Sequence, residues 1–224
     1  MRMNLTPAVK NLIIINVLVY LACFVFPDFL NRTLSGYSFS SPNFRPWQIV
    51  THMFMHAQHY IDKSMVKHIE FTHILFNMYG LYVFGSAIEN YLGTKRFLIY
   101  YFFCGIGAFF LHMGVSYFEC FDFQNLAINY KISDSLFIPV VGASGAVMGV
   151  MIGFAILYPN AELMLLFPPI PIKAKYFVLI YGAIEFYMAM RQNPDDNVAH
   201  YAHLGGMLFG YLLLKYWQKN SKVW

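Results

Sequence analysis

The sequence predicts an all-α membrane protein, built as one bundle of six transmembrane helices. Of its 224 residues, 58% are hydrophobic and only 12% are charged, whereas a soluble domain carries about 25% charged residues. The mean hydropathy is +0.50. Apolar stretches near 20 residues recur along the chain, and about 20 such residues cross a hydrocarbon core. The length leaves room for a single domain, residues 1–224.

The first apolar stretch could be a cleavable signal peptide, because Arg2 and Lys10 resemble its charged beginning. However, residues 9–26 exceed the apolar region of such peptides, and no Ala-x-Ala-like cleavage site follows. We therefore expect a retained first helix. The six predicted spans are, approximately, 9–26, 71–91, 97–118, 137–158, 174–191 and 198–216.

The loop after the first span, about residues 27–70, is too long to be a plain turn. It carries three prolines and an aromatic cluster around Trp47. Long loops with such content are usually folded and functional. We expect a partly embedded, amphipathic helical hairpin that lies in the membrane interface. The segment 57–72 is extra length before the second span, and the sequence assigns it no role.

Lysine and arginine residues predict the orientation, because they are enriched in cytoplasmic loops. With a cytoplasmic N-terminus, nine of them fall inside and six outside. Both termini are then cytoplasmic, and spans two, four and six run from outside to inside. We interpret the net charge of +4 as this topology signal and expect no nucleic-acid partner. The three cysteines, Cys23, Cys104 and Cys120, predict no disulfide framework.

Three polar motifs interrupt the apolar spans. They are His73-Ile-Leu-Phe-Asn77, Gly142-Ala-Ser144-Gly145 and Ala202-His203-Leu-Gly205-Gly206. A polar side chain within a span costs free energy, so it indicates function by default. Ser144 is the candidate nucleophile and His203 its base. His73 and Asn77, spaced i,i+4, could stabilise an oxyanion together with the Ser144 backbone N–H. No carboxylate accompanies the pair on spans four or six, which favours a dyad over a triad.

The predicted spans bring these groups to one level. Ser144 lies about seven residues into span four, His203 about five into span six and Asn77 about six into span two, which is roughly 10, 8 and 9 Å of depth. Small residues recur every fourth position, in the series Gly145, Gly149, Gly153 and the series Ala202, Gly206, Gly210. Such stripes allow helix backbones to approach closely, so we expect span four to pack against span six.

Each polar residue also has a purely structural interpretation. Ser144 could bond a carbonyl of its own helix, and His73 and Asn77 could join helices without taking part in chemistry. His52, His56 and His59 have helical spacing, but His-Glu-x-x-His is absent, so we predict no metal. We expect His52 and His56 to form hydrogen bonds within the first loop. The agreement of all three motifs at one depth favours the catalytic interpretation.

Taken in order, these motifs together with Trp47-Gln48 and the His52–His56 loop resemble the rhomboid intramembrane serine proteases over nearly the whole chain. The resemblance implies a six-helix core, a Ser144–His203 dyad and an oxyanion hole from His73, Asn77 and the Ser144 N–H. It also implies cleavage of single-span membrane proteins near the outer face, without metal or organic cofactor. The supporting residues that it implies are Gly142, Gly145, Met148 and Gly206.

The chain departs from the family pattern in the loop and beside the base. Gln48 stands where an arginine often follows the tryptophan, which argues against a loop-anchoring ion pair with Glu89. Met148 occupies the place of an aromatic residue that stacks on the catalytic histidine, and methionine packs there more loosely. His200 is a rival base one turn nearer the surface, but it lacks the following glycine at the family spacing.

Glu185, about ten residues into span five, leaves two interpretations open. Its carboxylate could reach the outer interface as the helix tilts, or it could face the cavity above the dyad and tune substrate entry.

Three other functions compete with proteolysis by Ser144: an inactive rhomboid-like protein that binds membrane clients, an intramembrane metalloprotease, and a channel or transporter. The retained Ser144 and His203 argue against the first, the missing metal motif against the second, and the common depth of the polar groups against the third. The expected partners are transmembrane protein substrates and the lipid bilayer. A bacterial inner membrane is the expected location. The sequence does not specify the substrate or the oligomeric state.

Overall fold

The computed structural model describes residues 4–61, 67–122, 127–128, 138–164, 169–191 and 198–220. The described chain is mostly helical, with little strand, as predicted. Arg2, part of the 57–72 segment and the predicted start of span four at residue 137 lie outside these ranges. The long helices are α1 (Pro7–Val25), α6 (Thr94–Cys120), α8 (Ser144–Leu157), α9 (Ala174–Arg191) and α10 (His200–Asn220). The second predicted span consists of α4 (Thr72–Gly80), the π-helical turn η2 (Leu81–Gly85) and α5 (Ser86–Leu92).

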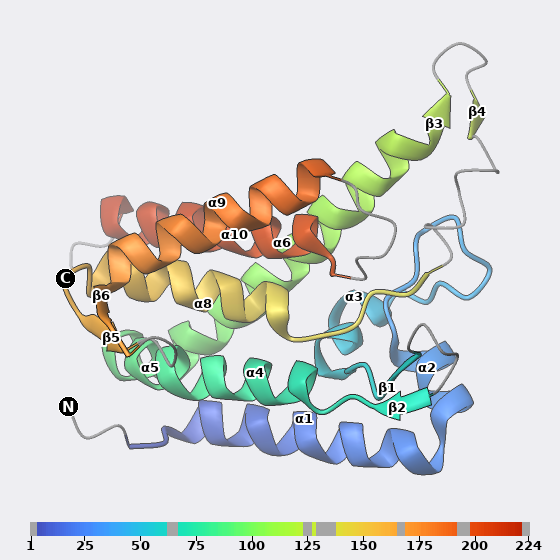
Figure 1. The fold of residues 1–224 in the computed structure, drawn as a ribbon, viewed down its shortest axis with the longest axis horizontal. Coiled ribbons are helices and arrows are strands. Elements are labelled where there is room, and N and C mark those ends of the chain that lie inside the picture. Colours follow the sequence, from blue (N-terminus) through green and yellow to red (C-terminus); the bar gives the residue numbers. More distant parts are fainter. Residues whose placement is uncertain are drawn as a thin grey trace.

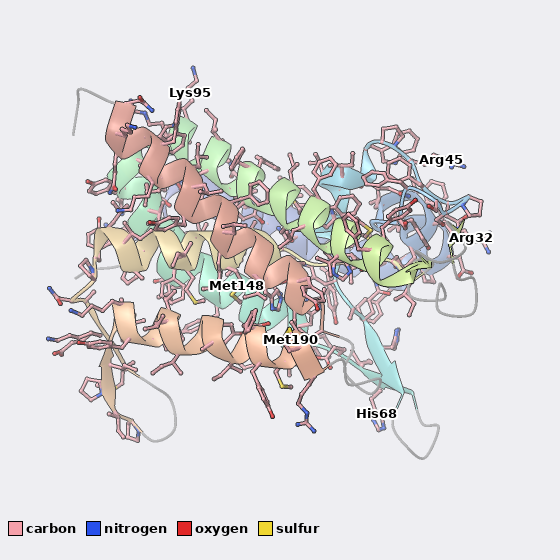
Figure 2. All side chains as sticks on the ribbon, turned by 90° about the horizontal axis from the view of Figure 1, so that it is seen from above. Arg32, Arg45, His68, Lys95, Met148 and Met190 are labelled. Atoms are coloured by element: carbon pink, nitrogen blue, oxygen red, sulfur yellow. The ribbon has the colours of Figure 1, made fainter. Side chains whose placement is uncertain are left out.

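The helices alternate in direction (Figure 1). Helices α4, α8 and α10 begin at one end of the bundle, where α1, α6 and α9 finish. We call this the loop end, because α2, α3 and the β1–β2 hairpin lie there, and we call the opposite end the terminal end. Helix α1 begins and α10 finishes at the terminal end (Figure 1), so the ordered parts of the chain nearest the two termini lie on the same side of the bundle. Lys95 lies at the terminal end, whereas Arg32 and Arg45 lie at the loop end (Figure 2).

Two helices of the described chain are long and apolar enough to cross a membrane, residues Pro7–Val25 and Thr94–Phe118. Ser144–Leu157 is a shorter apolar helix. The other crossings therefore stay predictions. Large apolar side chains such as Leu18, Leu75 and Leu179 are exposed, each by 60% or more. Monomeric soluble proteins rarely expose extended apolar patches, so this exterior suits a lipid environment.

Helix α8 is shorter than the predicted fourth span, because residues just before Ser144 are not helical. Val140 pairs with Gly36 of the first loop through two backbone hydrogen bonds, of 2.8 and 2.9 Å. Gly142 then has φ of +125°, which side chains other than glycine rarely adopt. The predicted depth of Ser144, seven residues into a helix, is therefore wrong, since Ser144 is the first residue of α8.

The first loop is helical only in part. It contains α2 (Pro27–Leu34), α3 (Gln48–Thr51) and the short 3₁₀ helix η1 (His52–Phe54), followed by the antiparallel strands β1 (His59–Ile61) and β2 (Lys67–Ile69). The extra segment before span two thus contains a β-hairpin, which the prediction of a helical first loop did not include. Two further hairpins pair β3 (Phe121–Asp122) with β4 (Ala127–Ile128) and β5 (Glu162–Met164) with β6 (Pro171–Lys173).

Gln48 anchors the first loop without a charge. Its side-chain nitrogen donates to the carbonyls of Arg32, Thr33 and Asn43 at 3.0, 3.3 and 3.1 Å. Its side-chain oxygen accepts the Arg45 N–H at 2.9 Å. This buried amide satisfies several backbone groups of the loop at once, which explains how the loop folds without an arginine at this position.

Glu89 is engaged elsewhere. Its carboxylate accepts the N–H groups of Ala8 and Val9, each at 3.0 Å, and the Thr94 hydroxyl at 2.7 Å. The first N–H groups of a helix have no intrahelical acceptor, and negative charge is favourable at that position. Glu89 therefore caps α1 at the terminal end, away from the first loop.

The predicted contact between spans four and six is confirmed. A Cβ atom on Gly206 would overlap the Gly145 carbonyl of α8, and one on Gly210 would lie 2.9 Å from Gly149 Cα. Helices α8 and α10 form the most extensive helix pair of the bundle. The small-residue stripes thus bring the two backbones into direct contact, and they carry Ser144 and His203 at their loop ends.

Candidate active site

Ser144 is held by the turn that begins α8. The Gly142 N–H donates to the His52 carbonyl at 3.0 Å, which ties this turn to the first loop. As the first helical residue, Ser144 has a backbone N–H with no acceptor in its own helix. Its side chain is half-buried. The serine therefore offers a hydroxyl and a helix-terminal N–H at the same place.

His73, near the start of α4, approaches this turn from the side. Its Nδ1 accepts the Ala57 N–H at 3.2 Å, so a neutral ring carries its proton on Nε2. A Cβ atom on Gly142 would lie 2.9 Å from His73 Nε2 and 3.5 Å from Ser144 Oγ. The space above the glycine is thus bordered by a serine hydroxyl and a histidine N–H donor, and a side chain at residue 142 would fill it.

Asn77 lies one turn further along α4 and is buried. Its amide nitrogen donates to the His73 carbonyl at 2.8 Å, which fixes the side chain and leaves the second amide proton for another acceptor. Its Oδ1 has no hydrogen-bond partner among the described residues. The i,i+4 pair His73 and Asn77 can therefore present two donors on one helix face.

His203 is buried in the first turn of α10. The adjacent Ala202 carbonyl oxygen lies 3.4 Å from where a Cβ of Gly145 would stand, so the neighbours of the serine and of the histidine touch. Within the described part of the chain, no hydrogen bond joins Ser144 to His203. Catalytic hydrogen bonds are often long in enzymes without substrate, and the two residues keep their roles as predictions.

An acid that the sequence left unassigned lies beside the histidine. Glu185 of α9 is only 5% exposed, so the interpretation in which it reaches the outer interface is wrong. Its Oε2 lies 2.6 Å from His200 Nδ1 and 3.0 Å from His203 Nδ1. The predicted Ser144–His203 pair, which has no acid on its own two spans, thus has a carboxylate on the neighbouring helix α9. The rings of His200 and His203 are nearly perpendicular, with centroids 6.4 Å apart.

The same three residues are the one group of histidine and acidic side chains in the described chain that could hold a metal ion. Ligand atoms around a tetrahedral zinc ion lie about 3.3 Å apart, given bonds of about 2.0–2.1 Å. The two nitrogen–oxygen distances here, 2.6 and 3.0 Å, are shorter than that. His200 Nδ1 is hydrogen-bonded to the carboxylate, whereas His203 Nδ1 has no hydrogen-bond partner among the described residues. The geometry therefore favours a hydrogen bond between Glu185 and His200 over a metal.

His52 and His56 of the first loop pack next to the candidate site. His52 Nδ1 bonds the Gln48 carbonyl at 2.8 Å, within the loop as predicted. His56 instead bonds Asn16 of α1, with Nε2 2.8 Å from Oδ1, so its expected partner within the loop is wrong. Burial lowers the pKa of His52 to about 4 and that of His56 to about 3, which keeps both rings neutral. The His56 ring packs edge-on against His73, with centroids 5.2 Å apart.

Met148 and Met190 both lie near the start of α10 (Figure 2), where α8 and α9 approach it at the loop end. Met148 is half-buried and packs against the apolar core. One further histidine, His112 of α6, interacts electrostatically with His203, and its Nδ1 is buried without a partner among the described residues. Its place in an apolar span was the signal that could have revealed it.

Comparison with known proteins identifies the family of the chain. The Rhomboid domain model matches residues 43–219. The chain is 28% identical over 181 residues to the rhomboid protein YdcA of Bacillus subtilis (strain 168), which covers 81% of this chain and 72% of YdcA.

Two further relatives are longer than the chain they match. The presenilin-associated rhomboid-like protein of Bos taurus mitochondria is 30% identical over 72% of this chain and 41% of its own length. The rhomboid protease AarA of Providencia stuartii is 29% identical over 67% of this chain and 52% of its own length. The chain thus spans about half or less of these two relatives. With the domain match covering most of its length, the chain belongs to the rhomboid family, whose members are integral membrane proteins.

Proposed function

We propose that this protein is an intramembrane serine endopeptidase that cleaves transmembrane segments of single-span membrane proteins near the outer face. The observation that carries the proposal is the space above Gly142, bordered by Ser144 Oγ and His73 Nε2. A nucleophile beside a preformed hydrogen-bond donor is the arrangement that acyl transfer requires. The name of AarA, a rhomboid protease, supports the same reaction.

In the proposed reaction, His203 Nε2 takes the hydroxyl proton as Ser144 Oγ attacks the scissile carbonyl carbon. The carbonyl oxygen becomes an oxyanion, which accepts hydrogen bonds from His73 Nε2–H, the free amide proton of Asn77 and the Ser144 N–H. His203 then gives the proton to the leaving amine, which departs with the bonding electron pair. Water, activated by the same base, hydrolyses the acyl-enzyme and restores the serine.

The proposed setting is a multi-pass bacterial inner-membrane protein with both termini in the cytoplasm. The loop end then faces outward, so water reaches Ser144 from that side. The distribution of lysine and arginine supports this orientation, because nine of them fall on the cytoplasmic side of the predicted topology and six on the outer side.

Reaction with a fluorophosphonate probe tests the proposal directly. The purified protein should be labelled at Ser144 and should cut a single-span membrane protein that carries a fluorescent label. Labelling at another residue, or cleavage that survives Ser144→Ala, would reject the mechanism. Binding of the membrane protein without labelling or cleavage would instead support an inactive client-binding protein.

A further inference from the structure

The carboxylate of Glu185 has an unusual setting. It is buried in α9, and one oxygen, Oε2, approaches the Nδ1 atoms of both His200 and His203. The Tyr181 hydroxyl, one turn earlier on α9, also interacts with it. Burying an ionised carboxylate is costly unless it is paired and hydrogen-bonded. The helix bundle therefore keeps a charge in its interior where a candidate catalytic base lies.

The contact restricts the protonation of His203. His203 Nδ1 has no hydrogen-bond partner among the described residues, but it lies 3.0 Å from a carboxylate oxygen. A negative oxygen this close attracts an N–H and repels a nitrogen lone pair, so it favours the proton on Nδ1. A neutral ring with its proton on Nδ1 has a lone pair on Nε2. That is the tautomer a general base needs, since Nε2 is then free to accept the proton of a hydroxyl. Without the carboxylate, the ring could hold its proton on Nε2 and would be unable to accept another there.

His200 fixes the acid from the other side. Its Nδ1 lies closer to Oε2, at 2.6 Å, than that of His203. The hydrogen bond from His200 therefore holds the carboxylate in place, 3.0 Å from His203 Nδ1. This contact also joins α9, which carries Glu185, to α10, which carries His200, at the loop end.

We propose that Glu185 is the positioning residue for His203, a third member that turns the Ser144–His203 pair into a relay with an orienting acid. The inference rests on the proposed function above. As Ser144 attacks, the hydroxyl proton moves to Nε2 and the ring becomes an imidazolium. Its Nδ1 proton stays on the ring, and Glu185 remains ionised and stabilises the positive charge. The Nε2 proton then passes to the leaving amine.

The test compares Glu185→Gln with wild type on two substrates, a single-span membrane protein and a small soluble ester. Loss of an orienting acid should lower kcat about 10²-fold on both, within the contribution of general-base catalysis, while KM changes little. A residue that controls only lateral entry of the substrate would slow cleavage of the membrane protein and leave the ester unaffected. That outcome, or a kcat close to wild type on both substrates, overturns the proposal.

Three controls separate a positioning role from loss of folding. Glu185→Asp keeps the charge and should recover part of kcat, whereas Glu185→Gln should not. Glu89→Gln alters a buried carboxylate at the terminal end and should leave kcat of the folded protein near wild type. The ¹⁵N spectrum of labelled histidine should show His203 protonated on Nδ1 in wild type; protonation on Nε2 there overturns the proposal even if the variants unfold.

Failure of the proposed function would look different. Wild-type protein that neither reacts with the fluorophosphonate probe at Ser144 nor cleaves a substrate removes the protease itself. A wild type that reacts, with Glu185→Gln reacting just as fast, removes only the role of Glu185.

Discussion

Two buried glutamates at opposite ends of the bundle show how one side chain serves two purposes. Glu89, 3% exposed, meets two backbone N–H groups of α1 and the Thr94 hydroxyl at the terminal end. Glu185, 5% exposed, meets two imidazole rings at the loop end. Backbone donors cannot be lost by titration, whereas imidazole protons can move. A buried carboxylate with fixed donors therefore indicates structure, and one with exchangeable donors indicates chemistry.

A serine at each end of the bundle can be compared in the same way, and replacing the one at the loop end should have the largest effect on activity. Ser144→Ala should abolish both cleavage and probe labelling while the protein stays folded, because the nucleophile is gone. Ser86, at the start of α5, is a matched control: its hydroxyl is buried without a partner among the described residues. Ser86→Ala should turn over substrate nearly as wild type does. Equal activity of both variants in a gel-based cleavage assay would contradict the assignment.

The next prediction concerns the contact between α8 and α10 near the loop end. Gly206→Val pushes a branched side chain into the Gly145 carbonyl, and such overpacking typically costs about 1–3 kcal/mol. We expect activity to vanish, because α10 carries His203 away from Ser144. Gly114→Ala in α6 is the control, since a Cβ there has no neighbour within 4 Å. Thermal unfolding in detergent and turnover, measured together, test this; a Gly206→Val protein that is both stable and active refutes the contact.

Asn77→Ala should lower kcat by about 10²–10³-fold, the usual cost of one oxyanion donor, and should change KM little. The amide is already oriented by the His73 carbonyl, so its second proton is aimed before substrate arrives. Steady-state kinetics on the membrane protein substrate provide the measurement. If only KM rises, Asn77 binds or packs and does not stabilise the oxyanion.

The residues of the candidate site could be named from sequence because each is a polar group in an apolar helix. Three motifs supply the candidate residues Ser144, His203, His73 and Asn77. The small-residue series that contain Gly145 and Gly206 predicted that spans four and six are in contact. Helix α9 also begins and ends as predicted, at residues 174 and 191, because Lys173 and Arg191 lie at the two ends of a largely apolar stretch.

The features that could not be predicted from the sequence depend mostly on contacts between distant residues. The start of α8 is delayed by pairing of Val140 with Gly36, more than 100 residues away. Whether Glu185 faces lipid or His203 depends on the rotation of α9, and exposed residues surround it in the chain. The π-helical turn at 81–85 has no reliable local signature either. Periodicity finds helices but does not fix how they face each other.

The glutamate at the terminal end should affect stability and spare chemistry. Glu89→Gln removes a charge-assisted cap from two N–H groups, and hydrogen bonds to charged groups are worth about 1.5–3 kcal/mol. We expect a lower unfolding temperature, with kcat of the folded fraction near wild type. A large loss of kcat at unchanged stability would show that Glu89 is not a purely structural acid, and would contradict the distinction from Glu185.

The last expected effect is a pH dependence of stability, through His56 in the first loop. Burial, with the nearby His73 as a lesser cause, lowers its pKa from 6.5 to about 3 in the folded state. The unfolded chain therefore binds the proton more readily, and the contribution of His56 to stability is complete above pH 6.5 and is lost as pH falls toward 3. The slope from one such group is at most about 1.4 kcal/mol per pH unit.

His56→Gln tests this directly. The glutamine amide can donate to Asn16 Oδ1, as His56 Nε2 does at 2.8 Å, but it does not titrate. Its free energy of unfolding should consequently fall less steeply than that of wild type between pH 6.5 and 4, when both are measured by denaturation in the same detergent. The two curves should converge at the acidic end of this range, because protonation of the wild-type ring cancels its advantage. Parallel curves would mean that His56 does not control acid stability, despite its burial between α1 and the candidate oxyanion residue His73.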